Sequence, residues 1–141
     1  MQKGRAIALL VCLVLLLAAL PTALADAQMR DLSSQEFVRQ MGLGWNLGNT
    51  LEATGGRLDS ISAYETSWGN PLTTKEMLAK IAGLGVRSLR LPVAWSNLMA
   101  EDFTIHPDLM NRVEEITQMA LELEMTVVIN IHWDGGWFTR F

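Results

Sequence analysis

Hydrophobic positions along the chain follow two alternating patterns, one with the period of a helix and one typical of buried strands. The helical segments are residues 33–41, 73–84 and 107–123, and the strand-like apolar runs are residues 43–47, 86–93 and 126–132. Strands that alternate with helices predict a parallel α/β architecture. A long loop, residues 50–71, follows the first strand, and loops of this length in compact domains are more often functional than idle.

Each predicted helix begins with a recognisable signal. Ser33 with Glu36, and Thr73 with Glu76, have the spacing of a capping box, in which each partner satisfies a backbone N–H of the first turn. Pro107 suits the first turn of the third helix, because that position needs no N–H donor. The sequence therefore predicts three capped helices between the strands.

Side chains alternate across a strand, so each predicted strand has two faces. The apolar faces, which we expect to pack under helices, consist of Leu43, Trp45 and Leu47, then Leu89, Leu91 and Val93, then Val127, Ile129 and Ile131. Trp45 is thus assigned to the core, and the third strand is expected to be covered on both faces. The opposite faces bring Asn46, Arg90, Asn130 and His132 together near the carboxyl ends of the strands. In β/α barrels the active site lies at this end.

Arg90 and His132 are the residues of this group best suited to take part in catalysis or binding. A guanidinium on a buried strand is costly unless acceptors satisfy it, so Arg90 is either half of a structural ion pair or, as we favour, a site residue. His132 and Asp134 have a spacing that suggests a metal site, but zinc normally takes three or four protein ligands. No metal is therefore expected, and His132 is interpreted as a hydrogen-bonding imidazole. Asp134 equally suits the turn before Gly135.

Aromatic and acidic residues beyond the strand ends are the remaining candidates. Trp68, Trp133 and Trp137 can offer flat platforms to sugar rings, with core packing as the alternative. Glu52 is the glutamate best placed for ligand contact. The other acidic candidates lie on the polar face of a predicted helix and are expected to be solvated: Glu114, Glu115, Glu122 and Glu124.

The N-terminus has the pattern of a secretory signal peptide. Lys3 and Arg5 precede an apolar run, residues 6–20, and a small-residue site at Ala23-Leu24-Ala25. The run is shorter than the roughly 20 residues that span a bilayer. We expect residues 1–25 to be removed and residues 26–141 to be secreted, without the sole cysteine, Cys12. The mature part has a net charge of −6, which argues against a nucleic-acid partner.

Four motifs together resemble glycoside hydrolase family 5, and its subfamily 4 endoglucanases most closely. They are Gly-Trp-Asn-Leu-Gly-Asn-Thr-Leu-Glu at 44–52, Glu-Thr-Ser-Trp-Gly-Asn-Pro at 65–71, Arg-Leu-Pro-Val at 90–93 and Asn-Ile-His-Trp-Asp at 130–134. The resemblance implies a TIM (β/α)8 barrel, of which this chain supplies about the first three β/α units. It also implies that both catalytic glutamates lie beyond Phe141, so this segment alone is expected to be inactive and poorly folded.

The resemblance also implies residue roles. Arg90 resembles the arginine that supports the nucleophile, His132 the histidine lining the catalytic subsite, and Asn49 and Glu52 resemble sugar-binding residues on the glycone side. Trp133 stands where the family often has a second histidine, which substitutes stacking for a polar contact.

The function that the resemblance implies is a secreted endo-β-1,4-glucanase acting on β-glucan by a retaining mechanism. Such an enzyme works without a cofactor, as a monomer and away from the membrane. The alternatives are the same fold acting on xyloglucan, mannan or xylan, and a non-catalytic glycan-binding protein.

Overall fold

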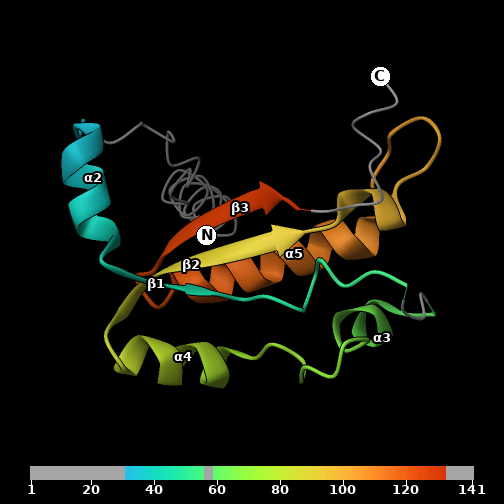
Figure 1. Cartoon of the computed structure of the whole chain (residues 1–141), viewed down its shortest axis with the longest axis horizontal. Coiled ribbons are helices and arrows are strands. Elements are labelled where there is room, and N and C mark those ends of the chain that lie inside the picture. Colours follow the sequence, from blue (N-terminus) through green and yellow to red (C-terminus); the bar gives the residue numbers. More distant parts are fainter. Residues whose placement is uncertain (1–30, 56–58, 133–141) are drawn as a thin grey trace, which may run out of the picture. The chain divides into compact units, whose positions relative to one another are not determined.

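The computed structural model describes residues 31–55 and 59–132. The chain divides into two compact units, Met1–Leu32 and Ser33–Phe141, and every element below belongs to the second. Along the chain these elements are α2 (Ser34–Met41), β1 (Leu43–Asn46), α3 (Ile61–Glu65), α4 (Lys75–Gly83), β2 (Val86–Val93), the 3₁₀ helix η1 (Trp95–Leu98), α5 (Pro107–Leu121) and β3 (Thr126–Ile131) (Figure 1). The predicted alternation of helices and strands is confirmed, and the loop after the first strand contains α3.

The three strands form one parallel sheet in the order β1-β2-β3. The strands follow one another in sequence with helices between them, which is the repeat of a β/α barrel. Asn46 is paired with Arg90, and Pro92 with Asn130. This register places the carboxyl ends of all three strands at one edge of the sheet, where the arrows of β2 and β3 point in Figure 1.

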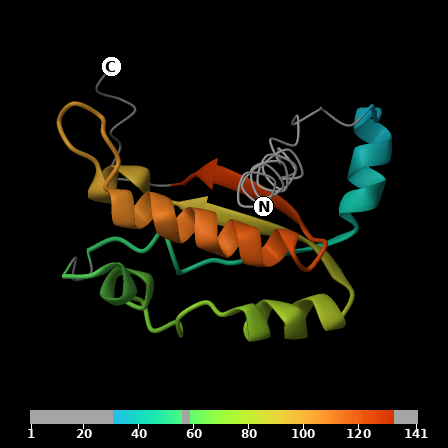
Figure 2. The same ribbon diagram turned by 180° about the vertical axis from the view of Figure 1, so that it is seen from behind.

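The core lies between the sheet and the helices α4 and α5. Figure 2 shows α5 crossing one side of the sheet. The buried side chains of these elements are Leu78 of α4, Leu89, Leu91 and Val93 of β2, and Leu109, Val113, Ile116 and Ala120 of α5. Each fully buried leucine or isoleucine contributes roughly 1.5–3 kcal/mol relative to an exposed one. The helical pattern of hydrophobic positions predicted for residues 107–123 is confirmed at the four buried positions of α5.

The outer strands are less covered than the sequence predicts. Trp45 on β1 is 36% exposed, and Ile129 and Ile131 on β3 are 45% and 60% exposed. The core assignment of Trp45 is wrong for the described residues, as is the prediction that β3 is covered on both faces. Within the described residues β1 and β3 each pair only with β2. They are therefore the edge strands of the sheet, and fewer neighbouring side chains cover them. In a closed barrel no strand remains an edge.

The helix starts follow the predicted capping signals with one shift. At α2, Ser33 Oγ accepts from the N–H of Glu36 at 3.3 Å, and the Glu36 carboxylate accepts from the N–H of Ser33 at 2.9 Å. The predicted capping box is confirmed there. At α4 the cap is Thr74, whose hydroxyl accepts from the N–H of Met77 at 3.3 Å. The prediction of Thr73 is wrong by one residue because the buried N–H of Thr73 donates instead to Glu65 Oε1 at 2.7 Å.

A buried ion pair connects α3, the segment before α4, and α5. Glu65 is fully buried and accepts from Arg112 Nε at 2.7 Å and from Arg112 Nη2 at 3.0 Å. Arg112 Nη2 also donates to the carbonyl of Thr73 at 2.7 Å. Glu65 raises the pKa of the Arg112 guanidinium through these hydrogen bonds. A two-point contact between guanidinium and carboxylate fixes orientation as well as distance. It therefore fixes the positions of these three segments relative to one another.

Candidate functional site

Three of the predicted site residues meet at the carboxyl ends of the strands. Arg90 Nη1 donates to Asn46 Oδ1 at 2.5 Å, and Arg90 Nη2 lies 3.4 Å from His132 Nδ1. The backbone N–H of His132 donates to the carbonyl of Val93 at 3.1 Å, which continues the pairing of β3 with β2. Alternation along each strand and the parallel register together account for this cluster.

The contact with Arg90 indicates the tautomer of His132. A guanidinium has only donors, so Nδ1 of His132 is the acceptor in this contact, and the tautomer that permits it carries its proton on Nε2. His132 is exposed, so this Nε2–H is available as a donor to a ligand oxygen. Among the described residues neither side chain bonded to Arg90 is a carboxylate, so these contacts do not support the ion-pair interpretation.

Asn130 lies in β3, two residues before His132. Its Nδ2 donates to the carbonyl of Ile131 at 2.8 Å. Its Oδ1 is buried and, among the described residues, has no hydrogen-bond partner. Buried polar atoms are rarely left unpaired, so Asn130 Oδ1 is a further acceptor at this edge of the sheet.

The segment after β1, residues 47–54, forms a compact turn that we call the β1 loop. Asn49 in this loop has a φ of 59°, a left-handed conformation that is uncommon for any residue but glycine. Glu52 stabilises it, because its Oε1 accepts from the N–H of Asn49 at 2.6 Å and its Oε2 from the N–H of Thr50 at 2.9 Å. Glu52 is only 6% exposed, whereas the side chain of Asn49 is exposed.

Side chains from later segments satisfy the carbonyl groups of the β1 loop. The donors are Asn70 Nδ2 to Gly48 O at 2.7 Å, Tyr64 Oη to Leu51 O at 2.8 Å, Asn97 Nδ2 to Ala53 O at 3.1 Å and Trp68 Nε1 to Thr54 O at 2.9 Å. Trp68 keeps 48% of its surface exposed while this bond fixes its indole. The loop is therefore held from α3, from the segment after α3 and from η1.

Gly48 allows the β1 loop to approach the Arg90 cluster. A Cβ at this position would lie 2.5 Å from Asn46 Nδ2 and 3.3 Å from Glu52 Oε1. The first distance is below any real contact, so a side chain would displace the Asn46 amide that binds Arg90. Only glycine lets the cluster and the loop lie this close.

Tyr64 makes the stability of the folded protein depend on pH in the alkaline range. Burial raises the pKa of Tyr64 above its ordinary value, with the charge of Glu52 acting in the same direction and the hydrogen bond from Asn97 opposing it. A raised pKa means that the folded protein resists ionisation, so stability is fully present below pH about 10 and falls as the pH rises further.

We expect Tyr64→Phe to be less stable than wild type at neutral pH and to lose less stability than wild type at alkaline pH. At neutral pH it should lower the free energy of unfolding by about 1–3 kcal/mol, because the buried carbonyl of Leu51 loses its donor. Above pH 10 the difference from wild type should shrink, since phenylalanine cannot ionise. Urea unfolding of the full-length protein between pH 7 and 11 measures both values, and a constant difference would contradict the prediction.

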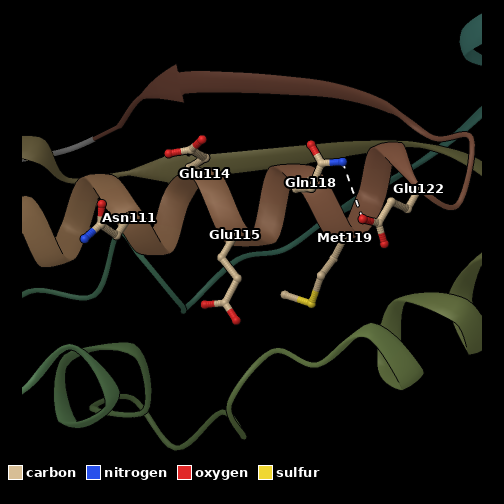
Figure 3. Close-up of a pocket in the computed structure, with 6 residues that line it drawn as sticks. All are labelled: Asn111, Glu114, Glu115, Gln118, Met119 and Glu122. Carbon is tan, nitrogen blue, oxygen red and sulfur yellow. Dashed lines mark hydrogen bonds between the residues drawn. The ribbon is translucent and has the colours of Figure 1, made fainter. Parts of the chain in front are cut away.

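Acidic residues of α5 line a pocket that is distinct from the strand-end cluster. Figure 3 shows its lining, which comprises Asn111, Glu114, Glu115, Gln118, Met119 and Glu122. The four glutamates predicted to be solvated are all exposed, which confirms that prediction. Glu115 binds Arg112 at 2.6 Å, and Glu122 binds Lys75 at 2.6 Å. Glu115 and Glu122 thus take part in surface ion pairs, and within the described residues no hydrogen bond or ion pair joins any of the four glutamates to the strand-end cluster.

Within residues 31–55 and 59–132, no cluster of three or more histidine, cysteine, aspartate or glutamate side chains could hold a metal ion. Among the same residues, no helix is both long and apolar enough to cross a membrane.

The structure brings several of the predicted site residues close together, and it adds contacts that the sequence did not predict. Arg90, His132, Asn49, Glu52 and Trp68 all lie at or near the carboxyl ends of the strands. Trp133, Asp134 and Trp137 lie outside the described residues. The missed residues are the supports of the β1 loop, namely Tyr64, Asn70 and Asn97. Asn70 belongs to the 65–71 motif, and Tyr64 is the only tyrosine in the sequence, so both had a signal, whereas Asn97 had none.

Known proteins are similar to this chain in sequence. The family model described as cellulase (glycosyl hydrolase family 5) matches residues 51–141. Endoglucanase B of Clostridium cellulovorans is 46% identical over 119 residues, which cover 83% of this chain and 25% of that protein. A xyloglucan-specific endo-β-1,4-glucanase of Bacteroides ovatus is 41% identical over 115 residues, covering 79% of this chain and 23% of that protein. The chain thus spans about a quarter of the length of these curated relatives.

The structural comparison agrees. The solved structure of ZgEngAGH5_4 in complex with a cellotriose superposes with a TM-score of 0.70 at 46% identity, covering 79% of this chain and 32% of that one. The predicted fold class is confirmed, since the three parallel strands match part of a family 5 barrel. From the family model over residues 51–141 and these likenesses, the chain belongs to glycosyl hydrolase family 5.

Proposed function

We propose that the full-length protein is a secreted endo-β-1,4-glucanase that hydrolyses β-glucan polysaccharides. The observation that carries this proposal is the cluster of Asn46, Arg90 and His132 at the carboxyl ends of the strands, where barrel enzymes bind their substrates. The exposed Asn49 and Trp68 lie on the loops around it. Relatives named endoglucanases, at 37% identity and above, support the same activity.

The proposed mechanism is retaining hydrolysis by two glutamates about 5–5.5 Å apart, through a covalent glycosyl intermediate. Neither glutamate is assigned to residues 1–141. Arg90 would hold the nucleophilic carboxylate with N–H groups that Asn46 and His132 leave unused, and His132 would donate its Nε2–H to a sugar hydroxyl. No cofactor or metal takes part in this scheme.

Substrate binding in this proposal combines flat and polar contacts. Trp68, Trp133 and Trp137 would stack on pyranose rings, because aromatic faces suit the apolar C–H faces of sugars. Asp134 and Asn49 would bind hydroxyl groups, and Glu52 would support the glycone side of the site through its bond to the backbone of Asn49. The acidic mature chain suits a neutral polysaccharide better than a nucleic acid.

Secretion is part of the same proposal. Cleavage after Ala25 would release a protein that begins at Asp26 and acts outside the cell as a monomer, without attachment to a membrane. N-terminal sequencing of the secreted protein tests this step. A mature N-terminus at Asp26 is the expected result, and a cell-bound protein that retains residues 1–25 would contradict it.

Xyloglucan is the second candidate substrate. The observation that favours it is the 41% identity to a xyloglucan-specific endo-β-1,4-glucanase. Both substrates share a β-1,4-glucan backbone, so the same strand-end cluster would serve either. Xyloglucan carries branches on this backbone, so its cleavage requires a site that accommodates them.

One assay series tests the function and the choice of polymer. The full-length secreted protein is incubated with carboxymethylcellulose, barley β-glucan, xyloglucan and mannan, while viscosity and reducing ends are recorded. Proton NMR of the first products reports their anomeric configuration. We expect a rapid fall in the viscosity of β-glucan with β-configured products. No cleavage of any β-1,4-glucan, or α-configured products, would contradict the proposal.

A further inference from the structure

Glu52 is buried and its carboxylate binds the backbone of its own loop, which is unusual for a residue expected to contact substrate. It is 6% exposed, and each carboxylate oxygen already accepts a short hydrogen bond from a backbone N–H. Each oxygen could accept a second hydrogen bond, but the 6% exposure of Glu52 leaves a sugar hydroxyl little access to it. This burial argues against direct contact between Glu52 and substrate.

The two N–H groups that Glu52 accepts are consecutive, those of Asn49 and Thr50. Consecutive N–H groups around a left-handed residue form a small concave site for an anion. Asn49 is the left-handed residue here, with a φ of 59°. An asparagine in this conformation needs a compensating interaction, and the Glu52 carboxylate provides it from within the same turn.

Neighbouring groups hold the backbone of this turn in its observed conformation. The carbonyl of Gly48 accepts from Asn70 Nδ2 at 2.7 Å and from Thr50 Oγ1 at 3.1 Å. Glu52 Oε1 lies so near Gly48 that a Cβ there would be 3.3 Å away. The backbone on both sides of Asn49 is therefore fixed, and with it the direction in which the exposed side chain leaves the loop.

We propose that Glu52 is a positioning residue that does not touch the substrate, and that it acts by holding Asn49 so that the Asn49 amide binds a pyranose hydroxyl. This inference rests on the proposed function, because it names the role of Glu52 within the same site. In this proposal Asn49 contacts the sugar, and Glu52 fixes the backbone conformation from which Asn49 makes that contact. The effects of substituting the two residues must consequently depend on each other.

A double-mutant cycle in the full-length protein tests this dependence. Glu52→Gln keeps the shape but places an NH₂ group against a backbone N–H, and Asn49→Ala removes the amide. Each single substitution should lower kcat/KM on barley β-glucan about tenfold, mainly through KM. The double variant should be no worse than Asn49→Ala alone. A loss of about a hundredfold in the double variant, the product of the single effects, would overturn the proposal.

Affinity electrophoresis in gels containing barley β-glucan gives the same cycle without turnover. If wild type is retarded but cleaves nothing, the proposed function fails while the cycle on dissociation constants still decides the role of Glu52. A wild type that neither binds nor cleaves β-glucan overturns both proposals. Glu114→Gln, at an exposed glutamate of α5, is the matched control and should leave binding and kcat/KM unchanged.

A stability measurement covers the case in which Glu52→Gln fails to fold. Glycine adopts the left-handed conformation without help, so Asn49→Gly should remove the need for Glu52. The fall in Tm caused by Glu52→Gln should be clearly smaller in the Asn49→Gly background, and a misfolded Glu52→Gln protein should be rescued by it. An equal fall in Tm in both backgrounds, or no rescue, would contradict the proposal.

Discussion

Replacing Arg90 by lysine in the full-length protein should lower kcat/KM on β-glucan by about 10²–10³-fold, the typical effect of losing a preorganised donor in an active site. Arg90 reaches Asn46 with Nη1 and His132 with Nη2. A lysine ammonium is a compact point charge on a flexible stem and cannot reproduce this planar fork. His132 would lose the donor that fixes its Nδ1, and with it the orientation of Nε2–H. Steady-state kinetics on barley β-glucan measures the loss.

Arg87 provides the matched control for this substitution. It lies in the same strand, but its Nη1 donates to the carbonyls of Ala82 and Val86, away from the cluster. Arg87→Lys should change kcat/KM by less than about twofold, as is usual for surface substitutions. Both variants should unfold at temperatures near that of wild type. If Arg90→Lys kept more than half of the activity, Arg90 would not belong to the active site.

Glu65→Gln should destabilise the full-length protein by about 3–5 kcal/mol, because it leaves the guanidinium of Arg112 without its buried counter-charge. The Glu65 side chain is fully buried and that of Arg112 is 12% exposed, so water cannot replace the lost partner. The same change weakens the hydrogen bond to the N–H of Thr73 just before α4. Urea unfolding at pH 7 measures the free-energy difference.

Glu115→Gln separates this burial effect from the loss of a charge. Glu115 also binds Arg112, at 2.6 Å, but its side chain is 60% exposed. Exposed ion pairs contribute about 0–1 kcal/mol, so this variant should be destabilised far less than Glu65→Gln. Equal losses would mean that burial does not govern the pair. Replacing both Glu65 and Arg112 by apolar residues should recover part of the stability lost in Glu65→Gln.

The sequence predicts elements well where the local signal is strong. The bounds of β2 agree residue for residue, and Pro107 begins α5 as predicted. The errors arise where a tertiary contact decides. Alternation tells which side chains share a face, but it cannot tell whether another layer covers that face, which is why Trp45 was misassigned. Thr73 and Thr74 have equal capping propensity, and only the contact of Thr73 with Glu65 selects Thr74 as the cap.

The site shows the same division. Alternation and parallel register suffice to bring Asn46, Arg90 and His132 together, because both follow from strand geometry alone. The supports of the β1 loop come from residues far along the chain, such as Asn97, which donates to Ala53 from 44 residues away. Such pairings leave no periodic pattern. The sequence likewise places Glu52 just after the first strand but does not reveal that its carboxylate turns back onto the loop.

A crystal structure of the full-length secreted protein soaked with cellotriose tests the central claim most directly. That claim is that a β-glucan substrate binds at the carboxyl ends of the strands, beside Arg90 and His132. The expected result is a sugar ring with a hydroxyl within hydrogen-bond distance of His132 Nε2 and another at the Asn49 amide. A cellotriose bound elsewhere, with the strand-end cluster unoccupied, would contradict the account.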